Sequence, residues 1–299
     1  MVSNLFPRIG NAAGSCKHLP QLKKLIGAVD VPTVGSIVVP QRSGNLGLPY
    51  YRHPELGSVN KLGIPCPGLA YYQENLPLMV ELANAHDKRL AVSIASLSQG
   101  DLSILAKACC TAGVDIIEVN EGCGHIILPG GKQKPIPSYD PEQLDQDLSE
   151  VESVAPVTAE LRVKLSPYFD NVLIEKVANV LKKHPRYIPV FCNTLANISM
   201  LRAEDRTPAI KFTDGLGGHG GSDVFRWIVR GVIIQFQQHL PGRRMIAVGG
   251  IYRGVHLLDY LDQDIEEMQI GTAYIDNEDP HVFSRIRQEY ADTLNNQED

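Results

Sequence analysis

The sequence lacks any run of the roughly 20 apolar residues that a membrane-spanning helix requires. It also lacks the basic and then apolar stretch of a secretory signal peptide, because Pro7, Gly10 and Gly14 interrupt the first residues. Both absences argue against insertion into a membrane and against export. We therefore expect a cytoplasmic protein without a membrane partner.

Positive charge is also sparse. The 299 residues carry a formal net charge of −6, and the basic residues form isolated pairs such as Lys23-Lys24, Lys182-Lys183 and Arg243-Arg244. Such pairs are too short to follow a phosphate backbone, so we expect no nucleic-acid partner. The six cysteines show neither the C-x-x-C spacing of metal sites nor the spacing of a disulfide framework, and the sequence predicts reduced thiols and no metal site.

What the sequence does contain is a regular alternation of short apolar runs with segments of helical periodicity. The predicted strands are 33–39, 90–94, 116–119, 161–165, 189–192, 245–248 and 267–270. The predicted helices are 20–25, 74–85, 99–112, 145–153, 170–183, 222–239, 253–261 and 281–293. This alternation is typical of an α/β protein, a parallel sheet covered by helices.

The residues that follow the predicted strands favour a closed (β/α)8 TIM barrel over an open sheet. Polar or glycine residues come directly after most strands, and barrel enzymes assemble their sites at these carboxyl ends. No repeat, linker or low-complexity tract divides the chain, so we predict one domain over residues 1–299. The segment 122–142 is long, irregular and rich in glycine and proline, which predicts an active-site lid loop.

Two late glycine turns are candidates for a phosphate site. Gly249-Gly250 and Gly271-Thr272 each follow a late strand and precede a helix, where backbone N–H groups can hold an anion. The alternative is that these glycines only make tight turns. The glycine-rich segment 215–221 adds flexible backbone to the same region.

Lys164 lies between the apolar residues Val163 and Leu165 of a predicted strand, where a buried ammonium needs an anionic partner. Three roles fit the residue type: a cation beside a flavin that becomes negative on reduction, a Schiff-base lysine, or one half of a structural ion pair.

A longer set of motifs resembles the soluble dihydroorotate dehydrogenases, the class 1A type with a cysteine base, FMN and a homodimeric barrel. The motifs occur in the family's order and are Asn11–Gly14, Gly57–Pro65, Glu118–Cys123, Val163–Asp170, Asn193-Thr194, Asp214–Gly221, Gly249-Gly250 and Gln269–Thr272. The resemblance covers nearly the whole chain. It implies oxidation of dihydroorotate in pyrimidine biosynthesis, with a soluble electron acceptor.

The resemblance also implies a role for individual residues. Cys123 would remove a proton from the substrate. FMN would contact Ala12, Ala13, Ser36, Asn120, Lys164, Thr194, Gly220, Gly221, Gly249, Gly250, Gly271 and Thr272. The substrate would contact Asn60, Cys66, Asn120, His125, Asn193 and Thr194. Asparagine offers a donor and an acceptor that match an imide or ureide edge, and a thiol can act as a base when water is excluded.

Four positions depart from the family pattern, and all surround the substrate. Gly35 replaces a lysine, Cys66 replaces an asparagine, Gly122 replaces a serine and Gly124-His125 replaces a proline–asparagine pair. In one interpretation the chain still oxidises dihydroorotate, and Lys61, Arg42 or Lys132 supplies the lost charge.

Three other functions remain open. A related flavin oxidoreductase would act on another cyclic substrate, and His125 is similar to the corresponding residue of dihydropyrimidine dehydrogenases. A lyase would use Lys164 as a Schiff base without flavin. A barrel that binds flavin without catalysis would not depend on Cys123.

Overall fold

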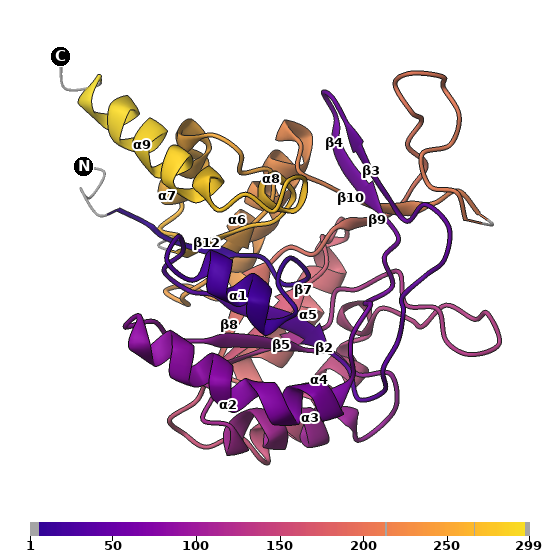
Figure 1. The fold of residues 1–299 in the computed structure, drawn as a ribbon, viewed down its shortest axis with the longest axis vertical. Coiled ribbons are helices and arrows are strands. Elements are labelled where there is room, and N and C mark those ends of the chain that lie inside the picture. The colour runs from indigo at the N-terminus through magenta and orange to yellow at the C-terminus, as the bar shows by residue number, and fades with distance from the viewer. Residues whose placement is uncertain (1–5, 213, 266, 297–299) are drawn as a thin grey trace.

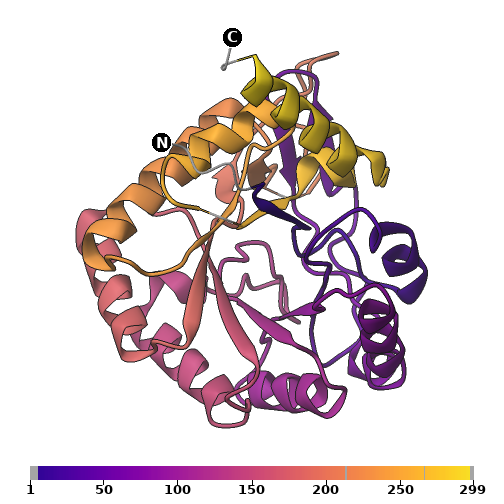
Figure 2. The ribbon, with the colours of Figure 1, turned by 90° about the vertical axis from the view of Figure 1, so that its left-hand side faces the viewer.

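The computed structural model describes residues 6–212, 214–265 and 267–296. Eight strands form one sheet in which every pairing is parallel, in the order β1-β12-β11-β8-β7-β6-β5-β2. The strands are β1 (Arg8–Asn11), β2 (Thr33–Ile37), β5 (Ala91–Ile94), β6 (Ile116–Asn120), β7 (Glu160–Leu165), β8 (Tyr187–Phe191), β11 (Ile246–Val248) and β12 (Glu267–Ile270). Figure 2 shows these strands in the interior with helices around them. The expected TIM barrel is confirmed.

A side chain helps to close the seam between the first and last strands of this order. The backbones meet there in the isolated parallel bridge between Gly10 and Val31. Beyond it, the buried Asn11 amide donates from Nδ2 to the Thr33 carbonyl (2.7 Å) and accepts the Thr33 N–H at Oδ1 (2.8 Å). An asparagine amide has the donor and acceptor of a peptide group, so Asn11 continues the ladder where backbone pairing ends.

Helices surround the barrel, and their apolar faces pack on the outside of the strands. They are α1 (Leu19–Leu25), α2 (Leu69–Ala85), α3 (Asp101–Thr111), α4 (Pro141–Glu152), α5 (Asn171–Lys183), α6 (Asp223–His239), α7 (Leu258–Leu261), α8 (Thr272–Ile275) and α9 (His281–Asn295). In α5, Ile174, Val177 and Leu181 recur at helical spacing and are buried. Asp170 caps this helix by accepting the Val172 N–H. None of the described helices is long and apolar enough to cross a membrane.

A second, antiparallel sheet lies at one end of the barrel (Figure 1). It has the order β3-β4-β10-β9 and consists of β3 (Tyr50–His53), β4 (Gly57–Asn60), β9 (Leu195–Ile198) and β10 (Gly217–Gly220). Because β9 begins four residues after β8 ends, this small sheet is tied to the carboxyl ends of the barrel strands. It therefore extends the mouth where barrel enzymes bind ligands.

The predicted strands and helices are all present, but the sequence analysis missed β1 and the whole second sheet. Both consist of four-residue strands rich in polar or glycine residues, which carry little periodic signal. The glycine-rich segment 217–220 is a strand because it pairs with β4 and β9.

Three predicted helices differ from the structure by more than two residues at one end or in helix type. Helix α2 begins at Leu69, five residues before the predicted start, because the aromatic and apolar residues there already pack on the core. Helix α4 begins at Pro141, where Asp140 accepts the N–H groups of Glu142 and Gln143, so the irregular segment ends before residue 142. The predicted helix 253–261 is a 3-10 turn (Gly254–Leu257) followed by the short α7.

Candidate active site

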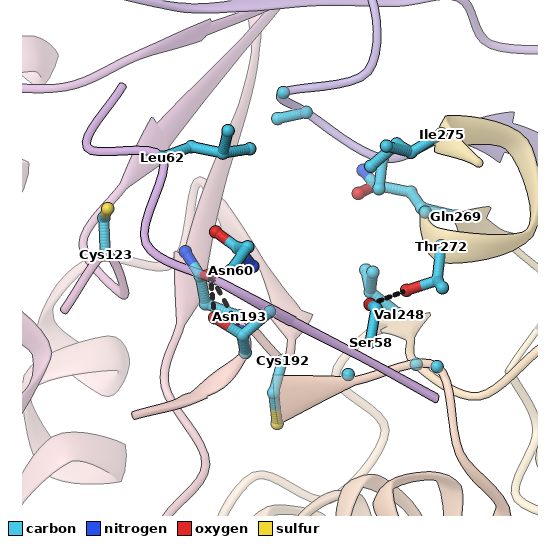
Figure 3. Close-up of a pocket in the computed structure, with 18 of the residues that line it drawn as sticks. Ser58, Asn60, Leu62, Cys123, Cys192, Asn193, Val248, Gln269, Thr272 and Ile275 are labelled. Carbon is cyan, nitrogen blue, oxygen red and sulfur yellow. Dashed lines mark hydrogen bonds between the residues drawn. The ribbon is translucent and has the colours of Figure 1, made fainter. Parts of the chain in front are cut away.

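A cavity of about 1230 Å³, including its part open to solvent, lies at the carboxyl ends of the barrel strands and beneath the second sheet. Sixteen of the predicted site residues line it, namely Ala12, Ala13, Ser36, Asn60, Asn120, Cys123, His125, Lys164, Asn193, Thr194, Gly220, Gly221, Gly249, Gly250, Gly271 and Thr272. Figure 3 shows Cys123 at one end of the cavity and the Ser58–Thr272 pair at the other.

A chain of hydrogen-bonded amides forms the floor between these ends. Asn193 donates from Nδ2 to Oδ1 of Asn120 (2.9 Å), and Asn120 donates from Nδ2 to the Ser36 hydroxyl (2.8 Å). The Thr194 N–H donates to Oδ1 of Asn193 (2.8 Å). Each amide is therefore held in one orientation, and each retains a second N–H or lone pair for a ligand.

Cys123 is half-buried in the irregular segment after β6. Burial raises the pKa of its thiol above the usual value, and the backbone N–H of His125 and the charge of Lys134 partly offset that rise. A thiol with this pKa is a proton carrier in its neutral form and a strong base once ionised.

His125 lies against β10 and is buried. Burial, and then the positive charge of Lys61, lower the pKa of its imidazole to about 4. The ring is therefore neutral near pH 7, and its Nε2 has no hydrogen-bond partner among the described residues. An unpartnered ring nitrogen in a ligand cavity is available to a substrate amide or carbonyl.

Lys164 points into the barrel from β7, as its position in an apolar strand predicted. Its Nζ donates to Oε1 of Gln269 (3.2 Å) and lies 3.9 Å from the carboxylate of Glu118 on β6. Glu118 accepts in turn from Nε2 of Gln269 (2.6 Å). Burial lowers the pKa of Lys164, and Glu118 opposes that change. The compensating anion that the sequence analysis required is Glu118.

The other end of the cavity is formed by glycine backbone. Gly221 has a φ of +73°, and a Cβ there would lie 2.6 Å from the Thr272 side chain. Gly250 has a φ of +64°, and its Cβ would lie 2.5 Å from the Ser222 carbonyl. Side chains are thus excluded, and backbone N–H groups can approach a ligand. The nearby Arg52 guanidinium pairs with Asp276 through Nε (3.0 Å), and its buried Nη1 has no hydrogen-bond partner among the described residues.

Cys66 does not line the cavity. Its thiol is buried in the core and accepts the N–H groups of Val38 and Gly68, each at 3.4 Å. The structure does not bring Cys66 together with the other predicted substrate residues, because its backbone pairs with Arg42 and its side chain is buried.

The three cations proposed to replace a side chain at position 35 also lie outside the cavity lining. Lys61 is fully engaged with Asp214 (2.5 Å and 2.6 Å). Arg42 donates to the Ile127 carbonyl (3.2 Å), and Lys132 is exposed on a short hairpin.

Several residues that were not predicted from the sequence also line the cavity. The main ones are Lys17, Tyr50, Ser58, Arg52 and Gln269. Gln269 lies inside a motif that the analysis quoted, and the alternation of β12 could have placed it beside Lys164 on the interior face. Ser58 also lies inside a motif of the resemblance, Gly57–Pro65. Tyr50 and Arg52 belong to the second sheet and could not be placed without it.

The fold and the cavity together define an enzyme scaffold, a TIM barrel with its ligand site at the carboxyl ends of the strands. Residues 3–294 match the family model described as dihydroorotate dehydrogenase, and the chain belongs to this family. It is therefore an oxidoreductase of the dihydroorotate dehydrogenase type, a class that acts on CH–CH bonds.

Individual relatives agree with this assignment. The chain is 32% identical over 288 residues to dihydroorotate dehydrogenase A (fumarate) of Lactococcus lactis subsp. cremoris strain MG1363, covering 95% of this chain and 89% of that protein. The enzyme of the same name from Lactococcus lactis subsp. lactis strain IL1403 is 32% identical over 260 residues, with coverages of 87% and 80%. The crystal structure of the Eimeria tenella enzyme in complex with ferulenol superposes with a TM-score of 0.78 at 18% identity, covering 97% of this chain and 82% of that one, which supports the fold.

Proposed function

We propose that this chain oxidises dihydroorotate to orotate with FMN as cofactor and Cys123 as the base. The observation that carries the proposal is the convergence of a thiol, a pair of oriented amides and a buried lysine in one cavity. The amides can hold the imide edge of a ring substrate. The thiol can then remove a proton from a ring carbon beside a carbonyl.

The residues present fit FMN. The glycine backbone at Gly221, Gly249 and Gly250 leaves room for a phosphate, and the unpartnered nitrogen of Arg52 supplies positive charge at that end. Lys164 would stabilise negative charge on the ring system at the centre of the barrel. Bound FMN would take up the two electrons and the hydrogen that leave the substrate with them.

The protein side chains would do the remaining work. Asn120 and Asn193, fixed by their mutual hydrogen bond, would hold the amide edge of the substrate. Cys123 as thiolate would take the proton, and the irregular segment around it would exclude water. A soluble oxidant would accept the electrons. We also propose that the protein acts in the cytoplasm as a homodimer, which size-exclusion chromatography with light scattering would test.

The visible spectrum of the purified protein tests the cofactor assignment, because FMN absorbs in the visible range. Anaerobic addition of dihydroorotate should then bleach this absorbance, and the Cys123→Ala variant should bleach far more slowly. A yellow protein that dihydroorotate does not bleach at any concentration would refute the substrate assignment and leave the cofactor assignment intact.

A second candidate is a flavin oxidoreductase that acts on an uncharged cyclic amide. The neutral His125 with its unpartnered Nε2 favours it. Bleaching by dihydrouracil at much lower concentration than by dihydroorotate would select this function. A colourless protein whose Lys164 is trapped by borohydride in the presence of a carbonyl substrate would instead select the Schiff-base lyase.

A further inference from the structure

Lys17 follows β1 in a turn that hydrogen bonds fix beside β2. The backbones of Cys16 and Gly35 form an antiparallel bridge, in which Gly35 donates to the Cys16 carbonyl (2.9 Å) and Gly14 donates to the Gly35 carbonyl (2.6 Å). The Lys17 N–H donates to Oε1 of Gln21 (2.8 Å), and its carbonyl accepts from the Tyr72 hydroxyl (2.9 Å). Both polar atoms of the Lys17 backbone are therefore hydrogen-bonded, and Lys17 directly follows Cys16, the residue that pairs with Gly35.

The side chain of Lys17 lines the same cavity as Cys123, and its Nζ is held there by the carbonyl of Pro65, another lining residue. Burial lowers the pKa of Lys17 to about 8, and the nearby thiols of Cys66 and then Cys123 oppose that change. The charge of Lys17, after those of Lys134 and Arg42, lowers the pKa of Cys123. The ammonium of Lys17 and the thiol of Cys123 therefore share one cavity and interact electrostatically across it.

Lys17 differs from the other cavity-lining cations in its partner. Lys164 has Glu118, and Arg52 has Asp276 at 3.0 Å. The Nζ of Lys17 donates to the backbone carbonyl of Pro65 (2.8 Å), and within the described part of the chain no carboxylate lies within 4 Å of it. A partly buried ammonium held by a neutral carbonyl alone retains its need for an anion.

Strand β2 cannot supply a charged side chain to the cavity from position 35. Gly35 has a φ of +114°, and a Cβ there would lie 2.4 Å from the Ser93 carbonyl oxygen. Position 35 is therefore closed to any side chain.

We propose that Lys17 binds the anionic group of the substrate and so selects a cyclic amide that carries a carboxylate near the carbon deprotonated by Cys123. The identification of that carboxylate rests on the proposed function. The presence of an anion-binding cation next to Cys123 does not rest on it.

The first test measures alkylation of Cys123 in the purified protein, read at the Cys123 peptide by mass spectrometry. Iodoacetate is anionic and iodoacetamide is neutral, so the ratio of their rates reports the local field and requires neither turnover nor substrate. Lys17→Met should lower the ratio about fivefold or more, and Lys17→Arg should retain it. Lys24→Met, on the exposed face of α1, removes the same charge away from the cavity and should leave the ratio unchanged. An equal ratio in Lys17→Met and in the wild type would overturn the proposal.

The second test measures substrate selection. In Lys17→Met, the KM for dihydroorotate and the Kd for orotate should rise about 10- to 100-fold with a smaller change in kcat, while the Kd for uracil, which lacks the carboxylate, should stay within about twofold. Equal losses for orotate and uracil would show a structural role for Lys17 and refute its role in selectivity. If wild type does not respond to dihydroorotate, the proposed function fails, and the alkylation ratio still decides whether Lys17 binds anions.

Discussion

Asn193 and Asn120 are joined by a hydrogen bond of 2.9 Å between their side-chain amides, which come from the ends of two different strands. Asn120 is in turn joined to Ser36 on β2 and accepts the N–H of Gly122 (3.4 Å). The carboxyl ends of β2, β6 and β8 and the start of the Cys123 segment are thereby linked through side chains, which fixes the cavity floor before any ligand binds.

The amide pair should act as a unit. Asn120→Ala and Asn193→Ala should each weaken orotate binding about 5- to 20-fold, because each removes one ligand contact and releases the other amide. The double variant should lose less than the sum of the two free-energy changes, by on the order of 0.5–2 kcal/mol. Flavin absorbance changes on titration with orotate give the three Kd values. Strict additivity would show that the two amides act independently.

Cys123→Ser should lower kcat about 10²- to 10⁴-fold with FMN still bound, because a serine hydroxyl is a far weaker base at neutral pH. Burial raises the pKa of the Cys123 thiol. The base must be deprotonated, so wild-type kcat/KM should rise with pH through the neutral range and level off above the pKa. In the serine variant this rise should continue to higher pH. Stopped-flow flavin reduction between pH 6 and 10 measures both profiles, and a pH-independent wild type would argue against a thiol base.

Lys164→Met should have two separable effects. It removes a cation from the flavin site, and it leaves the buried carboxylate of Glu118 without its charge partner. We expect a loss of stability on the order of 3 kcal/mol and at least a tenfold rise in the Kd of FMN. Adding Glu118→Gln should restore most of the stability in urea unfolding but not the FMN affinity. Recovery of both would mean that Lys164 serves the barrel and not the cofactor.

Glu121 should make the protein less stable as pH rises. Burial, and then the charge of Asp147, raise the pKa of Glu121 to about 8, and neither of its oxygens has a hydrogen-bond partner among the described residues. The pKa of this carboxyl is near 4.5 in the unfolded state and about 8 in the folded state. Between these two pH values the folded state binds a proton that the unfolded state has released, so the free energy of unfolding decreases as the pH rises from about 4.5 to about 8.

Replacement of this carboxyl by an amide tests the effect. Glu121→Gln should be more stable than wild type by on the order of 1–3 kcal/mol at pH 8 and by much less at pH 5. Glu175→Gln, exposed on α5, is the control and should change little at either pH. Urea unfolding at the two pH values decides; a gain that does not depend on pH would contradict the assignment.

The sequence predicted the barrel and most of the cavity because those features depend on contiguous motifs. Lys164 was predicted to face the barrel mouth because a lysine ammonium in an apolar strand cannot be buried among apolar side chains without a large free-energy cost. Lys17 could not be predicted, because its position depends on pairing between Cys16 and Gly35, which are 19 residues apart. Cys66 was misplaced because sequence order gives the path of a loop and not the direction of its side chains.

The junction between β1 and β2, where Asn11 bonds to Thr33, has a consequence for how the protein unfolds. Ala12 and Ala13 directly follow β1, Ser36 lies in β2, and all three line the cavity. A cofactor bound in that cavity would therefore contact both β1 and β2. Its binding energy would add to the two hydrogen bonds between Asn11 and Thr33 that hold these strands together. Loss of the flavin and separation of β1 from β2 should then be a single cooperative event. On heating, the absorbance of bound flavin and the signal of folded structure should be lost at the same temperature.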